Sequence, residues 1–317
     1  MKKYLYLLIA LLFLGLVWLF LQAHVQVKTQ PSTEQANLTS TKNSLATSTP
    51  SVAPKPSQEL ENETYTVDRE QITLYGKLTA PKTFKQEKRP LVIIAHGFNN
   101  TLDMYDDYAQ YLAKLGYVVY SFDFYGGSTR SRSGGTDMLN MSVLTQEADL
   151  AAVVNKLSQE SFIDTRNISL LGVSQGGVVS TLYAADNPQK ISKLLLIFPA
   201  FVLFDDVKET YNQLGVASPD QLPAIISHRN AQLGSIYLTD ALTIDIKQKM
   251  QAVNQPVLII QGTDDQVVPY SYAQEASNLF PQATLVTVPE GQHWIDQAFN
   301  QIALPALTEF LIQNSRQ

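Results

Sequence analysis

Short apolar runs alternate with amphipathic segments along most of the chain after residue 62. The runs that predict buried strands cover residues 91–95, 117–122, 168–171, 193–198, 256–261 and 284–288. Nearly every position in these runs is apolar, which is typical of strands in a parallel sheet that is covered on both faces. Two earlier stretches, 64–67 and 71–78, are predicted to form an antiparallel pair of strands ahead of that sheet.

Helical periodicity separates these strands. It is found at residues 104–115, 143–157, 178–185, 270–279 and 295–312. For the helix over 143–157, Thr145 is the expected N-cap because its hydroxyl can accept a hydrogen bond from the first turn. The alternation of strand and helix predicts the α/β class, with a mainly parallel sheet and helices on both faces.

The alternation lapses between residues 199 and 252, where the sequence has mixed character. Ligands of open α/β sheets bind outside the carboxyl ends of the strands. We therefore expect this segment to be a cap inserted over those ends. The alternative is an additional pair of helices that takes no part in substrate binding.

The first residues of the chain predict a membrane-spanning segment. Residues 4–21 carry no charge, and as a helix they would be about 27 Å long, close to the thickness of a bilayer's hydrocarbon core. Lys2 and Lys3 favour the cytoplasmic side, so residues 1–23 are expected to be an uncleaved anchor with the rest of the chain outside the cytoplasm. A cleaved signal peptide, which would release a secreted protein, is the alternative.

The next stretch, residues 24–62, is rich in Ser, Thr, Pro, Gln and Asn and poor in apolar residues. Such a composition buries too little surface to offset chain entropy, and it predicts a disordered tether. The predicted organisation is therefore an anchor, a tether and one α/β domain over 63–317 that contains the cap at about 199–252.

Composition excludes several classes of function. The chain of 317 residues has a formal net charge of −6 and no basic run beyond its extreme N-terminus, so nucleic acid is not an expected partner. It contains no cysteine, which rules out disulfides, thiolate metal sites and a cysteine nucleophile. The sequence has neither His-Glu-x-x-His spacing nor a Gly-rich phosphate loop, so no metal or cofactor is expected.

The strongest chemical signal is the sequence Gly172-Val173-Ser174-Gln175-Gly176. It follows an apolar run and precedes small and apolar residues at helical spacing, so it predicts a strand, a tight turn and a helix. The turn would hold Ser174 at positive φ, and a side chain at Gly172 or Gly176 would collide with the neighbouring strand or helix. Ser174 is therefore the predicted nucleophile.

A serine hydroxyl needs a base to become a nucleophile, and the base needs a carboxylate to orient it. Of the four histidines, His293 is the predicted base because it lies between the last strand and the last helix. The carboxylate is expected after another strand, where Asp264 and Asp265 both qualify. Asp205 and Asp206 form a rival position. The order serine, acid, histidine is the one expected when a nucleophile elbow carries the serine.

An oxyanion hole needs two N–H donors. Gln175 follows the nucleophile and is predicted to supply one backbone N–H. The loop after the first parallel strand supplies the other, and the amide of Phe98 is the expected donor. His96 in this loop is expected to shape it rather than to react.

Five motifs in this order resemble the α/β-hydrolase superfamily. They are residues 93–98, 121–128, 172–177, 262–269 and 291–293. The resemblance extends over about residues 65–312 and looks closest to bacterial feruloyl/cinnamoyl-type esterases and to the monoacylglycerol lipase and serine aminopeptidase-like group. It implies that Asp265, the fourth residue from the glycine of its motif, is the acid. It also implies that Asp123 supports its loop, and Tyr237 is a candidate for hydrogen bonding to the substrate from the cap.

The predicted function is a serine hydrolase that cleaves small-molecule carboxylic esters through an acyl-enzyme on Ser174. The alternatives are a peptidase of the serine aminopeptidase type, an acyltransferase with the same triad, and a non-catalytic surface binding protein on a hydrolase scaffold. Arg130 and Arg132 are candidates for binding an anionic group of the substrate, although a solvated loop is the simpler interpretation.

Overall fold

The computed structural model describes residues 59–313, and the predicted anchor (1–23) and most of the predicted tether lie outside them. Strand β1 begins at Leu60, two residues before the predicted end of the tether at residue 62. Among the described residues, no helix has the length and apolar character needed to cross a membrane.

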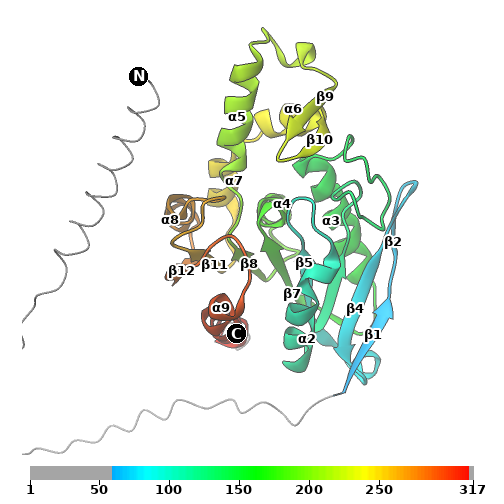
Figure 1. Cartoon of the computed structure of the whole chain (residues 1–317). Helices are drawn as coiled ribbons and strands as arrows, with labels where there is room; N and C mark the ends of the chain where they lie inside the picture. Colours follow the sequence, from blue (N-terminus) through cyan, green and yellow to red (C-terminus); the bar gives the residue numbers. More distant parts are fainter. Residues whose placement is uncertain (1–58, 314–317) are drawn as a thin grey trace, which may run out of the picture. The chain divides into compact units, whose positions relative to one another are not determined.

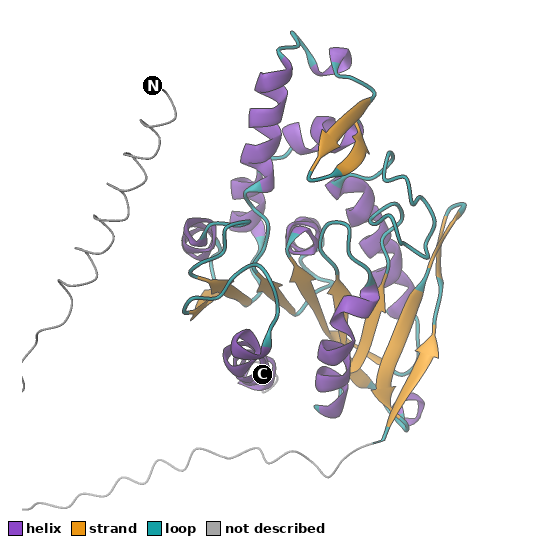
Figure 2. Cartoon of the chain, viewed as in Figure 1, coloured by secondary structure: helices purple, strands orange, loops and turns teal. Residues whose placement is uncertain are grey.

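An eight-stranded sheet with the order β1-β4-β6-β5-β7-β8-β11-β12 forms the centre of the domain (Figures 1 and 2). Its strands are β1 (Leu60–Thr64), β4 (Gly76–Pro81), β5 (Arg89–Ala95), β6 (Val118–Phe122), β7 (Ile163–Val173), β8 (Lys193–Ile197), β11 (Val257–Gly262) and β12 (Ala283–Val288). Strand β4 is antiparallel to both β1 and β6, whereas every pairing from β6 to β12 is parallel. This is the mainly parallel sheet that the apolar runs predict.

Helices cover both faces of the sheet. They are α2 (Asp106–Lys114), α3 (Val143–Leu157), α4 (Gln175–Asp186), α8 (Tyr270–Leu279) and α9 (Gln297–Gln313). Strand β5 shows how the two cores divide, because successive side chains of a strand point to opposite faces. Leu91 and Ile93 pack with the core that contains α3, α4 and α8, and Val92 and Ile94 pack with the core that contains α2 and α9.

Two local predictions differ from the structure. The N-cap of α3 is Ser142 instead of Thr145. Thr145 is the third residue of the helix and completes a capping box, in which each side chain bonds the other residue's backbone N–H. The predicted pair of strands at 64–67 and 71–78 is split in two. Strand β1 pairs with β4, and a separate hairpin joins β2 (Val67–Arg69) to β3 (Ile72–Leu74).

The segment at 199–252, which we call the cap segment, lies between β8 and β11. It contains α5 (Leu203–Leu214), the 3-10 turn Pro219–Gln221, β9 (Ile225–His228), β10 (Ala231–Gly234), α6 (Ile236–Leu242) and α7 (Ile246–Ala252). Figure 1 shows α5, α6 and the β9–β10 hairpin together on one side of the sheet. The hairpin turns at Arg229 and Asn230, whose φ angles are 46° and 63°, as a two-residue turn of this twist requires.

Candidate active site

Ser174 occupies a sharp turn between β7 and α4, with φ 52° and ψ −120°. Few residues with a Cβ adopt this conformation, and tertiary contacts must hold it. The neighbouring glycines allow the close approach that it needs. A Cβ on Gly172 would lie 2.5 Å from the carbonyl oxygen of Gly176, and a Cβ on Gly176 would lie 2.1 Å from the carbonyl oxygen of Ala95.

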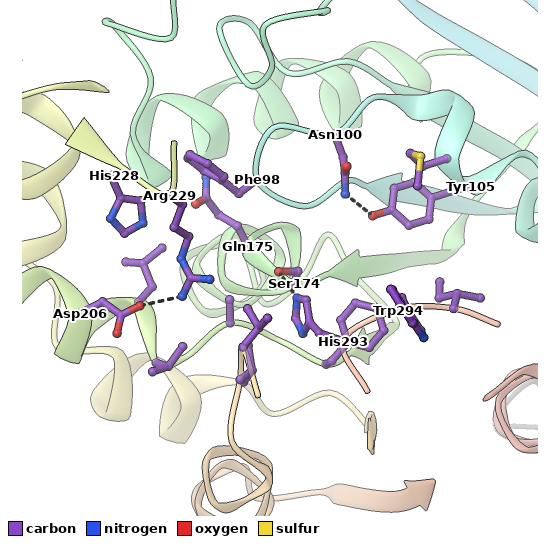
Figure 3. A pocket seen from close by; sticks show the side chains of 18 of the residues that line it. Phe98, Asn100, Tyr105, Ser174, Gln175, Asp206, His228, Arg229, His293 and Trp294 are labelled. Atoms are coloured by element: carbon purple, nitrogen blue, oxygen red, sulfur yellow. Dashed lines mark hydrogen bonds and ion pairs between the residues drawn. The ribbon is translucent and has the colours of Figure 1, made fainter. Parts of the chain in front are cut away.

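Ser174, His293 and Asp265 form one hydrogen-bonded chain (Figure 3 shows the first two). His293 Nε2 lies 3.0 Å from Ser174 Oγ, and His293 Nδ1 lies 2.7 Å from Asp265 Oδ2. The three side chains come from the loops that follow β7, β12 and β11. Because these strands run parallel in one sheet, with β8 between β7 and β11, their carboxyl ends lie at the same edge of the sheet.

The carboxylate of Asp265 is buried and held on both oxygens. Its Oδ1 accepts hydrogen bonds from the backbone N–H groups of Val267 and Val268, each at 2.8 Å, and its Oδ2 accepts one from Gln261 at 2.9 Å. Burial on its own raises the pKa of Asp265, but the bonds from His293 and from the two N–H groups outweigh it and leave the pKa below its ordinary value. Asp265 is therefore a fixed anion beside the imidazole.

The other candidate acids are directed elsewhere. Asp264 is exposed and accepts a hydrogen bond from Thr263 at 3.0 Å. Asp205 accepts one from Tyr272 at 2.8 Å, and Asp206 pairs with Arg229 at 3.0 Å.

Phe98 lies in the loop after β5, and Gln175 is the first residue of α4. Within residues 59–313, no hydrogen bond occupies the backbone N–H of Phe98. His96 shapes this loop: its buried Nε2 accepts a hydrogen bond from the N–H of Phe124 at 3.0 Å, and its Nδ1 donates to the carbonyl of Gly97 at 2.8 Å. Burial lowers the pKa of His96, which favours the neutral ring that these two bonds require.

Asp123 supports the neighbouring loop. Its buried carboxylate accepts hydrogen bonds from the N–H of Leu102 at 2.8 Å and from Arg132, through the backbone N–H at 3.0 Å and Nε at 3.1 Å. Arg132 also pairs with Asp103 at 2.9 Å. Neither Arg130 nor Arg132 lines the cavity at Ser174. Both are exposed loop residues, as the simpler interpretation predicts, and Arg132 is in addition held by two carboxylates.

A cavity of ≈ 360 Å³ opens beside Ser174 and His293 (Figure 3). Cap-segment side chains line one end of it: Asp206, His228, Arg229 and Tyr237. Burial, followed by the charge of Arg229, lowers the pKa of His228. The cavity is also lined by Met104 and Trp294, which are 61% and 62% exposed. The lining therefore includes an ion pair from the cap segment and, outside the cap segment, two exposed apolar side chains.

Tyr237 lines this cavity but is almost fully buried. Its hydroxyl donates a hydrogen bond of 2.9 Å to the side-chain oxygen of Gln175.

Sequence reasoning missed the other lining residues of the cap segment, above all His228 and Arg229. A basic residue at a hairpin turn is usually solvated, and no local pattern marks one that faces a cavity. No group of three or more His, Asp or Glu side chains suited to a metal ion occurs in the described part of the chain.

Comparison with known proteins supports the same architecture. Residues 86–219 match a family model described as serine aminopeptidase S33, and residues 218–295 match one described as the alpha/beta hydrolase fold. A monoglyceride lipase homolog of Monkeypox virus is 25% identical over 61% of this chain and 76% of its own length. Rat monoglyceride lipase is 24% identical over 56% of this chain and 66% of its own length.

Among solved structures, Est1E from Butyrivibrio proteoclasticus with bound ferulic acid has a TM-score of 0.71 and 26% sequence identity. The match covers 80% of this chain and 100% of that protein. About a fifth of this chain therefore has no counterpart in Est1E.

Proposed function

Because this chain is an ester hydrolase of the α/β-hydrolase superfamily, we propose that Ser174, His293 and Asp265 are its catalytic triad. The observation that carries the proposal is the unbroken chain of contacts from the Ser174 hydroxyl through both imidazole nitrogens to the Asp265 carboxylate. A hydroxyl, a base and an orienting acid in this order are the groups that acyl transfer to serine needs.

In acylation, Ser174 Oγ attacks the carbonyl carbon of the ester while His293 Nε2 takes the hydroxyl proton. Asp265 accepts a hydrogen bond from the Nδ1–H of His293. This bond fixes the tautomer in which Nε2 carries no proton and can act as a base. The carbonyl oxygen becomes an oxyanion, and the N–H groups of Phe98 and Gln175 bind it; donors of this kind typically contribute about 2.7–4 kcal/mol each.

The tetrahedral intermediate then collapses. His293 gives its proton to the leaving alkoxide oxygen, the carbon–oxygen bond breaks, and the alcohol departs from an acyl-enzyme on Ser174. For deacylation, His293 takes a proton from water as the water attacks the acyl carbon, and it returns that proton to Ser174 as the acid leaves.

The cavity favours a small-molecule ester with unlike ends. The ion pair of Asp206 and Arg229 on the cap segment offers both acceptors and donors, whereas the exposed side chains of Met104 and Trp294 offer apolar surface at the mouth. We propose that the polar part of the substrate binds toward the cap segment and that an apolar part extends past Trp294. The ring of Tyr237 packs against His228 and forms part of the wall at the cap end.

We further propose that the enzyme acts outside the cytoplasm, held at the cell membrane by residues 1–23. The support is the sequence alone, namely the uncharged stretch 4–21 after two lysines. Cell fractionation tests it: the intact chain should sediment with membranes and be cut by protease added to spheroplasts. Recovery of a shortened chain from the medium would favour the secreted alternative.

Substitution of the nucleophile tests the triad. Ser174→Ala in the full-length protein should reduce hydrolysis of p-nitrophenyl butyrate to background while circular dichroism remains that of the wild type. A panel with an aminoacyl arylamide separates ester from amide cleavage, and we expect turnover of the ester only. Retained ester turnover in the Ser174→Ala protein would refute the assignment of the nucleophile.

A further inference from the structure

Tyr237, a residue of the cap segment, contacts both residues that are expected to form the oxyanion hole. Its hydroxyl donates to the side-chain oxygen of Gln175 at 2.9 Å. Its ring also lies edge-on to the ring of Phe98, with 6.3 Å between centroids at an interplanar angle of 66°. The two proposed N–H donors come from different loops, so a side chain that touches both can fix their relative position.

The Gln175 side chain is itself clamped between two elements. Its oxygen accepts from Tyr237 on α6, and its amide nitrogen donates to Gln146 Oε1 on α3 at 2.8 Å. All three side chains are buried, with 2% or less of their surface exposed. The amide plane of Gln175 is thereby held from both ends, and so is the first turn of α4, which carries its backbone N–H.

Phe98 is held in a similar way from the cap segment. His228 on β9 lies edge-on to Phe98 with 5.7 Å between ring centroids, and it also packs against Tyr237 at 5.4 Å. The rings of His228 and Tyr237 therefore both pack against Phe98 in the loop after β5.

We infer that Tyr237 is a positioning residue: it couples the cap segment to the oxyanion hole and sets the rate of the chemical steps rather than the affinity for substrate. This inference rests on the proposed function, because it acts on the Phe98 and Gln175 donors. The donors must lie about 2.7–3.1 Å from the oxyanion and not from the ground-state carbonyl, so a small displacement weakens the transition state more than substrate binding.

The state of the Tyr237 hydroxyl suits this role. Burial raises the pKa of Tyr237 well above its ordinary value, so the hydroxyl keeps its proton and remains a donor. The hydroxyl already donates its hydrogen bond to Gln175. A substrate group could accept a hydrogen bond from Tyr237 only by displacing Gln175.

The test compares Tyr237→Phe with the wild-type full-length protein. The substitution removes the hydroxyl and keeps the ring, so only the bond to Gln175 is lost. With p-nitrophenyl acetate, whose acyl group has no further hydrogen-bonding group, we expect kcat to fall about 3- to 30-fold with KM changed less than twofold.

A transition-state readout separates positioning from general loosening. A trifluoromethyl ketone adds to the serine and forms a tetrahedral oxyanion, so its Ki depends on the same two N–H donors. The Ki should rise by the same factor as kcat/KM falls. Tyr272→Phe is the matched control, because it removes a 2.8 Å bond from a tyrosine on α8 to Asp205 on α5 and touches neither donor residue. It should leave kcat and Ki unchanged.

A second variant keeps the test informative if Tyr237→Phe is poorly folded. Gln175→Met removes the acceptor of the same bond while the backbone N–H remains, and it should lower kcat at least as much. Tyr237→Phe should then have no further effect in the Gln175→Met background, because the bond that it removes is already absent there.

Two results would overturn the inference. One is a raised KM for Tyr237→Phe with kcat and the ketone Ki unchanged, which would make the hydroxyl a substrate contact. The other is wild-type kinetics in the variant. Either result leaves the proposed function standing as long as Ser174→Ala is inactive, whereas an active Ser174→Ala protein would remove the premise itself.

Discussion

The loops that carry the proposed reacting groups and the cap segment that faces them are built in different ways. Ser174 and Asp265 follow the inner strands β7 and β11 of the sheet, and close backbone contacts fix their loops. The cap segment is a short hairpin and three helices, and its ion pair of Asp206 and Arg229 is partly exposed. We expect the first region to tolerate little change and to determine the chemistry. The second contacts the proposed oxyanion-hole residues through a few side chains, and we expect it to determine which substrates bind.

The largest effect that separates the two regions is expected at Asp265. Asp265→Asn should lower kcat for p-nitrophenyl butyrate by about 10⁴-fold, because an amide can stabilise the wrong imidazole tautomer. The neighbouring Asp264→Asn is a matched control with the same change in charge, and it should retain activity close to that of the wild type. Equal losses in the two variants would show that charge at this loop, and not the bond to His293, is what matters.

Glycine substitutions compare the rigidity of the two regions. Gly176→Ala should destabilise the protein by about 3 kcal/mol or more, because the added Cβ meets backbone that cannot move away. Gly215→Ala, at the end of α5 in the cap segment, has φ 65° and nothing within 4 Å of the new Cβ. It should cost only about 1–2 kcal/mol, the strain of the left-handed conformation. Denaturant unfolding of both variants gives the two free energies, and a larger cost at Gly215 would reverse the comparison.

The apolar mouth of the cavity should affect substrate preference and not the chemistry. Trp294→Ala is expected to lower kcat/KM for p-nitrophenyl decanoate about tenfold, since roughly 1.5 kcal/mol of apolar contact is lost, and to leave the butyrate nearly unchanged. Ile225→Ala removes an apolar side chain of the cap segment that is 51% exposed and does not line the cavity. It should alter neither rate, and an equal loss for both chain lengths in Trp294→Ala would argue against an apolar subsite.

The smallest effect concerns the contact between α3, α4 and the cap helix α7. Burial, followed by the charge of Asp186, raises the pKa of Glu147 from 4.5 to about 7. Ionisation of this carboxyl group is therefore harder in the folded than in the unfolded protein. It does not change the free energy of unfolding below about pH 4.5, lowers it increasingly as the pH rises toward 7, and lowers it most above that pH. Glu147→Gln should raise the melting temperature at pH 8 relative to the wild type by a few degrees, and should not do so at pH 5. An equal shift at both pH values would contradict this titration.

The sequence predicts the sheet-borne part of the site because short-range geometry determines it. Ser174 lies between Gly172 and Gly176, and the turn leaves no room for a side chain at either position. His293 and Asp265 follow apolar strands that belong to one parallel sheet, so their loops lie at the same edge. The preference for Asp265 over Asp264 came from the resemblance alone. The alternation of side chains along the sequence does not tell which of two adjacent loop residues points inward.

The cap end of the cavity was not predictable in the same way. Arg229 lines the cavity because the hairpin turn at positive φ brings it to Asp206 on α5, and this depends on tertiary packing rather than on any local pattern. Tyr237 was a candidate substrate contact, but nothing in the sequence indicated that its hydroxyl bonds to Gln175. The N-cap of α3 was misplaced by three residues because Ser142 and Thr145 are both good caps, and only the reciprocal bonds of the box distinguish them.

The most direct test of the central claim is the site of reaction with a fluorophosphonate, which modifies only a serine activated by a base. Peptide mass spectrometry of the full-length protein after labelling should find one phosphonyl adduct, on Ser174, with loss of ester turnover in proportion to labelling. An unlabelled Ser174 in protein that still hydrolyses esters, or an adduct on a different residue that accounts for the lost activity, would contradict the account.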